Sequence, residues 1–356
     1  MKTTKINDLV EYAYKKKVSD LHFIEGDAPC LRQFGKLYFL DHPPVTREYF
    51  AENIFPLIQE EDLKKFFVDK ELDFSTSFKD LCRSRINLYQ ERGNLAASLR
   101  LIPLDIPSMD ELGVPKIAHE FLKYHNGLVL VTGPTGCGKS TTLASMLEEI
   151  NQTKPWHVLT IEDPIEYVYS RKKSLISQRE VGGDTNQFGK ALQHAFRQDP
   201  DVVLVGEMRN LETIETVLTL AETGHLTFST LHTNDSVETL NRIIDSFPPY
   251  QQNQIRLQLM VCLRGVISQR LLPHKNGKGV VPVWEIMVVN KAIRNLIKEG
   301  KHYHIHSSIQ TGFSEGMTTL FQSVANAFEK GLISYETALN ALPEKRTFME
   351  KYGGRA

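Results

Sequence analysis

The sequence predicts an α/β protein whose larger part is a doubly wound sheet. A smaller N-terminal α/β domain and a helical C-terminal segment are expected beside it. Parallel strands that are buried on both faces are nearly continuous apolar runs. Four such runs occur, at residues 128–132, 158–161, 202–205 and 226–230. Helical segments separate most of these runs, as in doubly wound sheets. A glycine-rich turn at residues 133–140 lies between the first run and a helical segment.

The first hundred residues predict a mixed α/β module. A helical period covers residues 6–17, with apolar side chains at Leu9, Val10 and Tyr14. A second helix is expected over residues 47–68. Strands are expected at 19–24, 72–78, 83–89 and 95–101, and a hairpin with a central Gly35-Lys36 at 31–40.

Three prolines after residue 102 interrupt regular secondary structure. Pro103, Pro107 and Pro115 exclude one continuous helix or one central strand over this stretch. We therefore expect an N-terminal domain at residues 1–102, a linker at 103–116 and a second, larger domain at 117–356. After Pro282 the chain is expected to be mainly helical, at 292–299, 317–330 and 335–341.

Composition is that of an ordinary globular protein of two domains. The 356 residues exceed the size of one ordinary hydrophobic core. Lys and Arg number 42 against 43 Asp and Glu, a net charge of −1, so no strongly basic footprint points to nucleic acid. No apolar stretch is long enough to span a bilayer, and residues 1–8 lack the core of a signal peptide. Four dispersed cysteines fit a reducing cytoplasm.

The turn at residues 133–140 has the spacing of a phosphate-binding loop, Gly-x-x-x-x-Gly-Lys-Ser. Its glycines let successive backbone N–H groups face phosphates, and the following helix adds the positive end of its dipole. Lys139 is expected to reach the β- and γ-phosphates, and Ser140 to bind Mg²⁺. A chance glycine-rich turn is the alternative, which the strand before it and the helix after it disfavour.

Carboxylates follow two of the predicted strands. Glu207 stands after the run 201–205, where Gly206 replaces the acid usual at such a strand end. Glu162 and Glu166 follow the run 158–161. A carboxylate at the carboxyl end of a central strand points toward Mg²⁺ and water at a phosphate-binding loop. Each acid could instead be a solvated strand end.

Histidines and arginines give further candidates. His225 and His232 flank the fourth run, where an imidazole can sense a phosphate oxygen, although a hydrogen-bonded core histidine is the simpler interpretation. Three later histidines, at 302, 304 and 306, favour a solvated face over a metal site. An arginine from another domain or subunit can accelerate hydrolysis roughly 10³–10⁵-fold. The candidates, which could also form an exposed strand face, are Arg83, Arg85, Arg92 and Arg100.

Four segments together resemble the secretion ATPase superfamily of type II and type IV secretion and type IV pili. They are a Walker A box at 133–140, an Asp box at 160–166, a Walker B box at 199–212 and a His box at 224–233. The similarity extends to residues 19–22, 83–87 and 266–271. Residues 292–300 resemble a segment typical of PilT-like pilus retraction ATPases. The four-cysteine zinc site and extra N-terminal domain of assembly ATPases have no counterpart.

The resemblance implies a RecA-like P-loop domain, a PAS-like N-terminal domain and hydrolysis of ATP with Mg²⁺. The implied phosphate and Mg²⁺ site comprises Gly133, Pro134, Thr135, Gly136, Cys137, Gly138, Lys139, Ser140 and Thr141. Glu162 or Glu166 would position the attacking water, Glu207 would serve as the Walker B acid and Mg²⁺ ligand, and His225 and His232 would sense the γ-phosphate. The N-terminal arginines would contact nucleotide across a domain or subunit interface.

The implied assembly is a cytoplasmic homohexamer, peripheral to the inner membrane, that acts on an inner-membrane platform protein to retract pili. A type II or type IV secretion motor, or a pilus-assembly motor, is the nearest alternative. A RecA-like nucleic-acid translocase and a non-catalytic ATP-binding regulator are alternatives from other classes. Departures from the family pattern at Cys137, Gln198, Asn210 and Phe321 suggest a divergent member and remove no proposed catalytic group.

Overall fold

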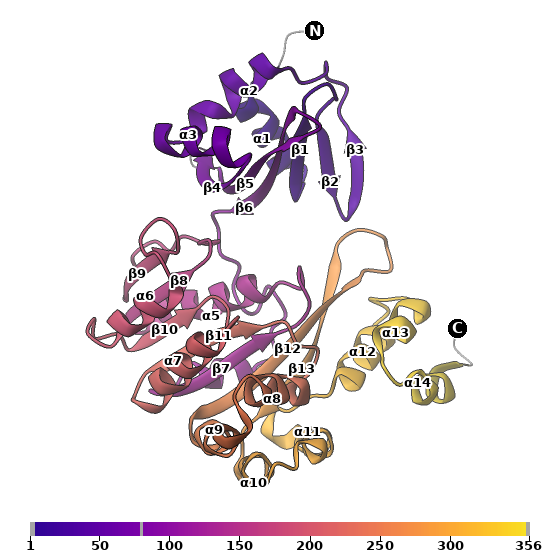
Figure 1. Ribbon diagram of the computed structural model, residues 1–356. Coiled ribbons are helices and arrows are strands. Elements are labelled where there is room, and N and C mark those ends of the chain that lie inside the picture. The colour runs from indigo at the N-terminus through magenta and orange to yellow at the C-terminus, as the bar shows by residue number, and fades with distance from the viewer. Residues whose placement is uncertain (1–3, 79–80, 354–356) are drawn as a thin grey trace. The chain divides into compact units, whose positions relative to one another are not determined.

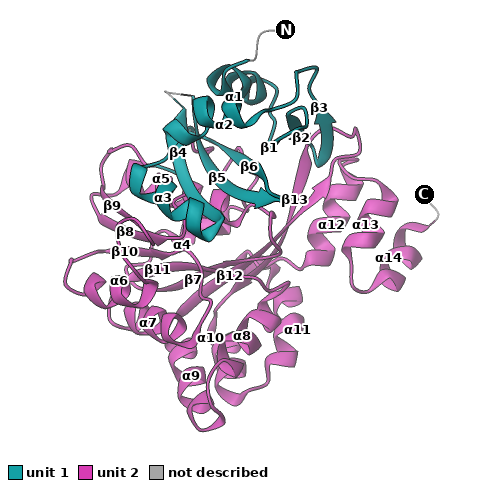
Figure 2. Cartoon of the chain, turned by 45° about the horizontal axis from the view of Figure 1, so that its top comes forward, with its two compact units in different colours: residues 1–105, 166–168 teal, residues 106–165, 169–356 magenta. Residues whose placement is uncertain are grey.

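The computed structural model describes residues 4–78 and 81–353 and separates into two compact units (Figures 1 and 2). Unit 1 consists of Met1–Asp105 and Glu166–Val168, and unit 2 of Ile106–Ile165 and Tyr169–Ala356. The stretch expected to be a linker is thus divided after Asp105. Its function as a linker stays a prediction.

Unit 1 is a six-stranded antiparallel sheet with helices on one face. The strand order is β3-β2-β1-β6-β5-β4. The strands are β1 (Asp20–Ile24), β2 (Cys30–Gln33), β3 (Lys36–Phe39), β4 (Glu71–Phe78), β5 (Cys82–Glu91) and β6 (Asn94–Pro103). Helix α1 (Ile6–Lys15) buries Leu9 and Val10 in the core of this unit. The expected strands and the hairpin at Gly35 are confirmed.

The prediction of a single helix over residues 47–68 is wrong. The structure has α2 (Arg47–Asn53), a 3₁₀ turn η1 (Phe55–Leu57) and α3 (Glu60–Asp69). Pro56 lies inside the 3₁₀ turn. Because proline lacks an N–H and its ring clashes with the preceding helical turn, it interrupts the α-helical pattern.

Unit 2 is a seven-stranded mixed sheet in the order β13-β12-β7-β11-β10-β8-β9. Every adjacent pair is parallel except β12 with β13. The strands are β7 (Gly127–Thr132), β8 (His157–Glu162), β9 (Leu175–Glu180), β10 (Val202–Val205), β11 (Leu226–Leu231), β12 (Leu263–Pro273) and β13 (Val280–Val288). All four apolar runs form parallel strands, as predicted.

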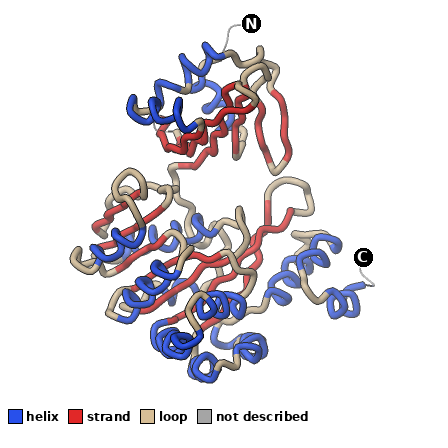
Figure 3. The backbone as a smooth tube through the Cα atoms, viewed as in Figure 1, coloured by secondary structure: helices blue, strands red, loops and turns tan. Residues whose placement is uncertain are grey.

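Helices cover both faces of this sheet (Figure 3). Along β7, Leu128 and Leu130 join one apolar core, whereas Val129 and Val131 join the other. This alternation explains why the strand is apolar at every position. The covering helices are α4 (Ile117–Phe121), α5 (Lys139–Thr153), α6 (Phe188–Ala195), α7 (Leu211–Glu222), α8 (Ser236–Asp245), α9 (Pro249–Cys262), α10 (Lys291–Glu299) and α11 (Ile305–Thr311).

The C-terminal segment is helical, as expected, and its first helix, α10, begins at Lys291, after Pro282. That residue lies within β13, which pairs with β12 as a long antiparallel hairpin. After α10 and α11 follow α12 (Leu320–Glu329), α13 (Tyr335–Ala341) and α14 (Lys345–Tyr352). The last three pack against the ends of β12 and β13 through Leu272, Val281 and Val283.

Among the described residues, no helix is both long and apolar enough to cross a membrane. All four cysteines are buried and carry free thiols. The carboxyl ends of β7, β11, β10 and β8 meet at one edge of the unit 2 sheet. The candidate catalytic and phosphate-binding groups at this edge lie at or just after the ends of these four strands.

Candidate active site

The glycine-rich turn lies between the buried strand β7 and the start of α5, as the sequence predicts. Gly133, Gly136 and Gly138 have φ values of 141°, 78° and 88°, which side-chain-bearing residues rarely adopt. Such backbone directs N–H groups into the concave side of a turn, where phosphate oxygens bind. Ser140 and Thr141 lie in the first turn of α5, near the positive end of its dipole.

Lys139 is held inside this turn. Its side chain is buried, and Nζ donates to the carbonyl oxygens of Gly133 at 2.9 Å and Pro134 at 3.1 Å. A buried ammonium requires such partners. Phosphate oxygens accept the same kind of hydrogen bond from an ammonium group, so Lys139 is suited to bind a polyphosphate.

Strand β12 packs against the phosphate-binding loop through Gln269. A Cβ atom on Gly133 would lie 2.3 Å from the backbone oxygen of Gln269 and 2.6 Å from Sγ of Cys137. The Thr142 hydroxyl donates to Oε1 of Gln269 at 2.7 Å. Gln269 therefore positions the phosphate-binding loop. Sequence analysis missed this role, although residues 266–271 form part of the family resemblance.

Cys137 is an inert member of the loop. Its side chain is 3% exposed, and burial raises the pKa of its thiol. A thiol that stays protonated and inaccessible reacts poorly with oxidants and alkylating agents. Cys137 therefore contributes backbone and packing to the loop.

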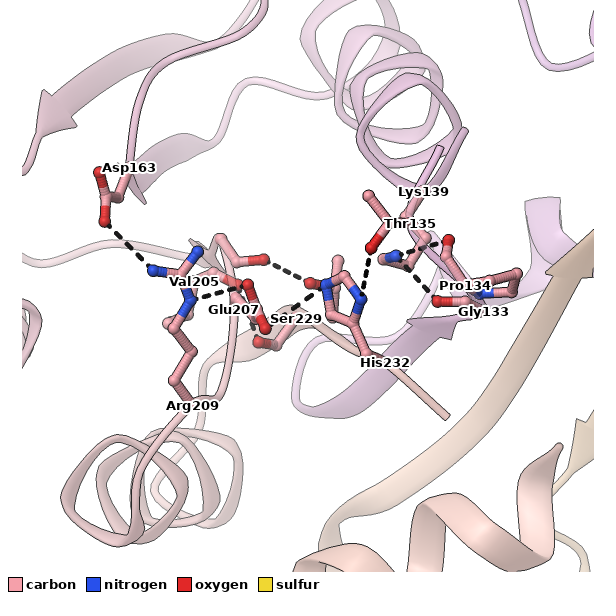
Figure 4. A network of polar contacts seen from close by, with 12 residues as sticks. Gly133, Pro134, Thr135, Lys139, Asp163, Val205, Glu207, Arg209, Ser229 and His232 are labelled. Atoms are coloured by element: carbon pink, nitrogen blue, oxygen red, sulfur yellow. Dashed lines mark hydrogen bonds and ion pairs between the residues drawn. The ribbon is translucent and has the colours of Figure 1, made fainter. Parts of the chain in front are cut away.

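A chain of polar contacts runs from the loop along the sheet edge (Figure 4). Thr135 Oγ1 lies 3.2 Å from Nδ1 of His232, and Nε2 of His232 lies 3.4 Å from Oε1 of Glu207. His232 follows β11, the neighbour of β7, and Glu207 follows β10, one strand farther. Because each strand adds about 5 Å across a sheet, the strand order places the two groups in sequence from the loop. The structure thus joins His232 and Glu207 to the loop.

The chain continues through two residues that sequence analysis did not assign. Arg209 Nε donates to Oε2 of Glu207 at 2.9 Å, and its Nη1 lies 3.5 Å from Oδ2 of Asp163. Asp163 follows β8, the next strand along the sheet. Both residues lie within the Asp and Walker B boxes, so their location was available from the sequence but their pairing was not.

The two Asp-box glutamates have different positions. Glu162 ends β8 at the same sheet edge, and its Oε1 accepts a long hydrogen bond, 3.5 Å, from Gln178 Nε2. Three strand spacings separate β8 from β7, about 14 Å. Glu166 belongs to the short segment grouped with unit 1. A water-activating role for either glutamate stays a prediction.

His225 lies away from the phosphate-binding loop of its own chain. It precedes β11, whose residue Leu226 pairs with Gly127 at the amino end of β7. The ring Nδ1 lies 3.1 Å from the carbonyl oxygen of Leu220, and Phe196 packs against the ring edge. Because β11 spans six residues, about 20 Å, His225 is at the sheet edge opposite the loop of its own chain. In its own chain His225 makes the hydrogen bond of a structural histidine, and a role as γ-phosphate sensor stays a prediction.

The four arginines of unit 1 do not form one cluster. Arg83 and Arg85 lie on one face of β5, and Arg85 pairs in register with Arg100 of β6. Arg92 lies instead in the turn at the far end of this hairpin, with φ of 52°. Arg100 Nε lies 3.0 Å from Oδ1 of Asp20. Contacts of these arginines with nucleotide stay a prediction.

A magnesium site formed by Ser140 and Glu207 stays a prediction. Mg²⁺ usually keeps several waters and takes one or two protein oxygens together with substrate phosphates. A hydroxyl at the start of α5 and a carboxylate at the same sheet edge provide such a set. In the part of the chain that the structure describes, no group of three His, Cys, Asp or Glu side chains could hold a metal.

Of the three later histidines, His302 departs from the expected solvated face. It is 8% exposed, and its Nδ1 lies 2.9 Å from Oδ1 of Asn241. His304 and His306 are exposed, as expected. Burial, and to a smaller degree the charge of Arg256, lower the pKa of His302 below its ordinary value of 6.5.

This shift predicts that acid destabilises the fold through His302. A lowered folded-state pKa means that the unfolded chain binds the proton more readily, so stability present above pH 6.5 is lost as the pH falls through the folded-state pKa. Chemical denaturation at pH 7.5 and 5.5 should show a smaller loss for His302→Gln than for the wild type. The exposed His304→Gln is the control, and an unchanged loss in His302→Gln would contradict the prediction.

Comparison with known proteins gives the family. The model of the family described as "Type II/IV secretion system protein" matches residues 97–340. A Pseudomonas aeruginosa protein described as a type IV pilus retraction ATPase, PilT, is 44% identical over 94% of this chain and 96% of its own length. A Neisseria gonorrhoeae "Twitching motility protein" is 44% identical over 87% of this chain and 83% of its own.

A solved structure agrees in fold. The crystal structure described as the pilus retraction motor PilT with bound ADP superimposes with a TM-score of 0.88 at 45% identity, covering 97% of this chain and 98% of that chain. Similarity at this level over nearly all of both chains includes both units and the phosphate-binding loop. The chain belongs to the type II/IV secretion system protein family.

Proposed function

We propose that this chain is an ATPase motor that drives type IV pilus retraction. One structural observation carries the enzymatic part: Lys139 lies in a preformed phosphate-binding loop that His232 connects to Glu207. Relatives described as a pilus retraction ATPase and a twitching motility protein match most of the chain and support the pilus system.

In this mechanism the loop backbone and Lys139 bind the β- and γ-phosphates of ATP. Mg²⁺ held by Ser140 and Glu207 would neutralise charge on the phosphates. His232 contacts both Thr135 of the loop and Glu207. It can therefore sense the γ-phosphate at one ring nitrogen and adjust Glu207 through the other. Glu162 or Glu166 would orient the attacking water.

The motor would act as a homohexamer at the cytoplasmic face of the inner membrane, where it engages a platform protein. Arg83, Arg85, Arg92 and Arg100 are candidates for contacts with nucleotide across an interface. Such contacts would couple hydrolysis to movement, because an arginine from another domain or subunit completes the charge at the phosphates.

Replacing the chromosomal gene with a Lys139→Ala variant tests this function. The variant should bind ATP poorly, so the cells should carry many static pili that do not retract. Surface pili and retraction events would be counted by microscopy. The control Lys154→Ala removes a lysine beyond the other end of α5, where it lies over Trp156.

Other outcomes would assign another role. Loss of surface pili in the Lys139→Ala strain would make the chain an assembly motor. Unchanged pili with normal retraction would contradict retraction as the function and direct the search to a secretion system. Either result would leave the ATPase assignment to be measured on the purified chain.

A further inference from the structure

Arg209 lies on a backbone segment that is anchored on both sides. The Gly206 N–H donates to the carbonyl of Ile161 at 2.9 Å, and the Met208 N–H donates to the carbonyl of Thr230 at 3.2 Å. These bonds tie the segment to β8 and β11. Immediately after Arg209, Asn210 caps α7 by accepting from the Thr213 N–H at 2.9 Å. These backbone hydrogen bonds fix the position of the Arg209 Cα atom, and so limit the directions in which its side chain can point.

The guanidinium joins two carboxylates from different strands. It contacts Oε2 of Glu207 and Oδ2 of Asp163, as Figure 4 shows. His232 contacts the other oxygen of Glu207, Oε1. Both oxygens of Glu207 therefore have a directed partner, so rotation of the carboxylate about its final bond would break both contacts.

The charge of Arg209 also has a local effect. Glu207 and Asp163 are acids at the sheet edge where the proposed function places the anionic phosphates of ATP. A cation between them offsets this excess of negative charge. The planar guanidinium can make both contacts in one fixed orientation, whereas an ammonium is a point charge.

We propose that Arg209 is a positioning residue that orients the Glu207 carboxylate for hydrolysis by linking it to Asp163. This inference rests on the proposed ATPase function and assigns to Arg209 a role that acts through Glu207. Arg209 need not touch nucleotide. Its loss should therefore lower the rate of the chemical step and leave nucleotide binding nearly unchanged.

Steady-state ATP hydrolysis by the purified full chain tests the proposal. Arg209→Gln should lower kcat about tenfold, near the low end for hydrogen bonds to charged groups because Arg209 is 61% exposed. KM and the dissociation constant for ADP should change less than threefold. Arg209→Lys keeps the positive charge but loses the planar set of N–H donors, so it should give an intermediate kcat.

A matched control is Arg346→Gln, which removes an exposed arginine paired with Glu350 on α14. This variant should keep the kcat of the wild type. Asp163→Asn should lower kcat in the same direction as Arg209→Gln, and the double variant should lose less than the product of the two single effects. In a Glu207→Gln background, Arg209→Gln should change kcat less than twofold.

Several outcomes would overturn the proposal. They are a kcat for Arg209→Gln within twofold of the wild type, a full tenfold effect in the Glu207→Gln background, and a loss of ADP binding equal to the loss of kcat. Absence of hydrolysis by the wild-type chain would overturn the proposed function together with this inference. An active wild type with an equally active Arg209→Gln variant overturns the inference alone.

Discussion

Replacing Glu207 with glutamine should lower kcat for ATP hydrolysis by about 10²–10³, the range found when one preorganised electrostatic group is removed from an active site. The amide keeps the size of the side chain but cannot carry the negative charge that Mg²⁺ and Arg209 require. Affinity for ADP should change only a few-fold, because the loop and Lys139 remain. Phosphate release and calorimetric ADP binding would measure the two effects.

Glu215→Gln is the matched control for this variant. Glu215 lies on α7, eight residues after Glu207, and is exposed. The control should retain the wild-type kcat and stability. A Glu207→Gln variant with a kcat within threefold of the wild type would show that another carboxylate carries the Walker B role.

Replacing Gly133 with alanine should be the most damaging single-methyl change in the phosphate-binding loop. The new Cβ would meet the Gln269 backbone oxygen at 2.3 Å, and φ of 141° is itself strained for alanine. Because the opposing atom is backbone of the sheet, relief requires the loop to move. We expect a loss of about 3 kcal/mol or more in the free energy of unfolding, together with weaker ADP binding.

Gly136→Ala separates the contact from the backbone strain. Gly136 also has positive φ, 78°, but nothing lies within 4 Å of the position that its new methyl group would take. Its alanine variant should lose only about 1–2 kcal/mol, the usual cost of left-handed backbone. Urea denaturation of both variants gives the difference, and equal losses would show that the contact with Gln269 has no energetic effect.

Local patterns were sufficient to predict four neighbouring strands of the unit 2 sheet, but not β9, β12 or β13. The runs that became β7, β8, β10 and β11 are apolar at nearly every position, and only strands covered on both faces require this. The phosphate-binding loop was equally predictable, because its glycines and Lys139 have a fixed spacing in sequence. By contrast, Pro56 shows how one residue overrides a helical period that its neighbours support.

Contacts between strands could not be obtained from such patterns. Arg209 and Asp163 are 46 positions apart, and they meet because β10 lies beside β8. Gln269 supports the loop because β12 pairs with β7, which no local pattern indicates. His225 and His232 belong to one sequence box, yet the length of β11 places them at opposite edges of the sheet. Strand order and strand length thus decided which candidates share a site.

The close approach of Gly133 to β12 bears on how the glycine motif is used in diagnosing activity. The opposing atom is a main-chain oxygen, so no side-chain replacement at position 269 removes it. A related protein that no longer hydrolyses ATP but keeps this sheet would still need glycine at position 133 in order to fold. The Lys139 ammonium, by contrast, donates to two carbonyl oxygens of the loop, where the phosphates of ATP are proposed to bind. Among copies of this protein that no longer hydrolyse ATP, Gly133 would be kept for folding, so the presence of Lys139 is a better indication of activity than the presence of this glycine.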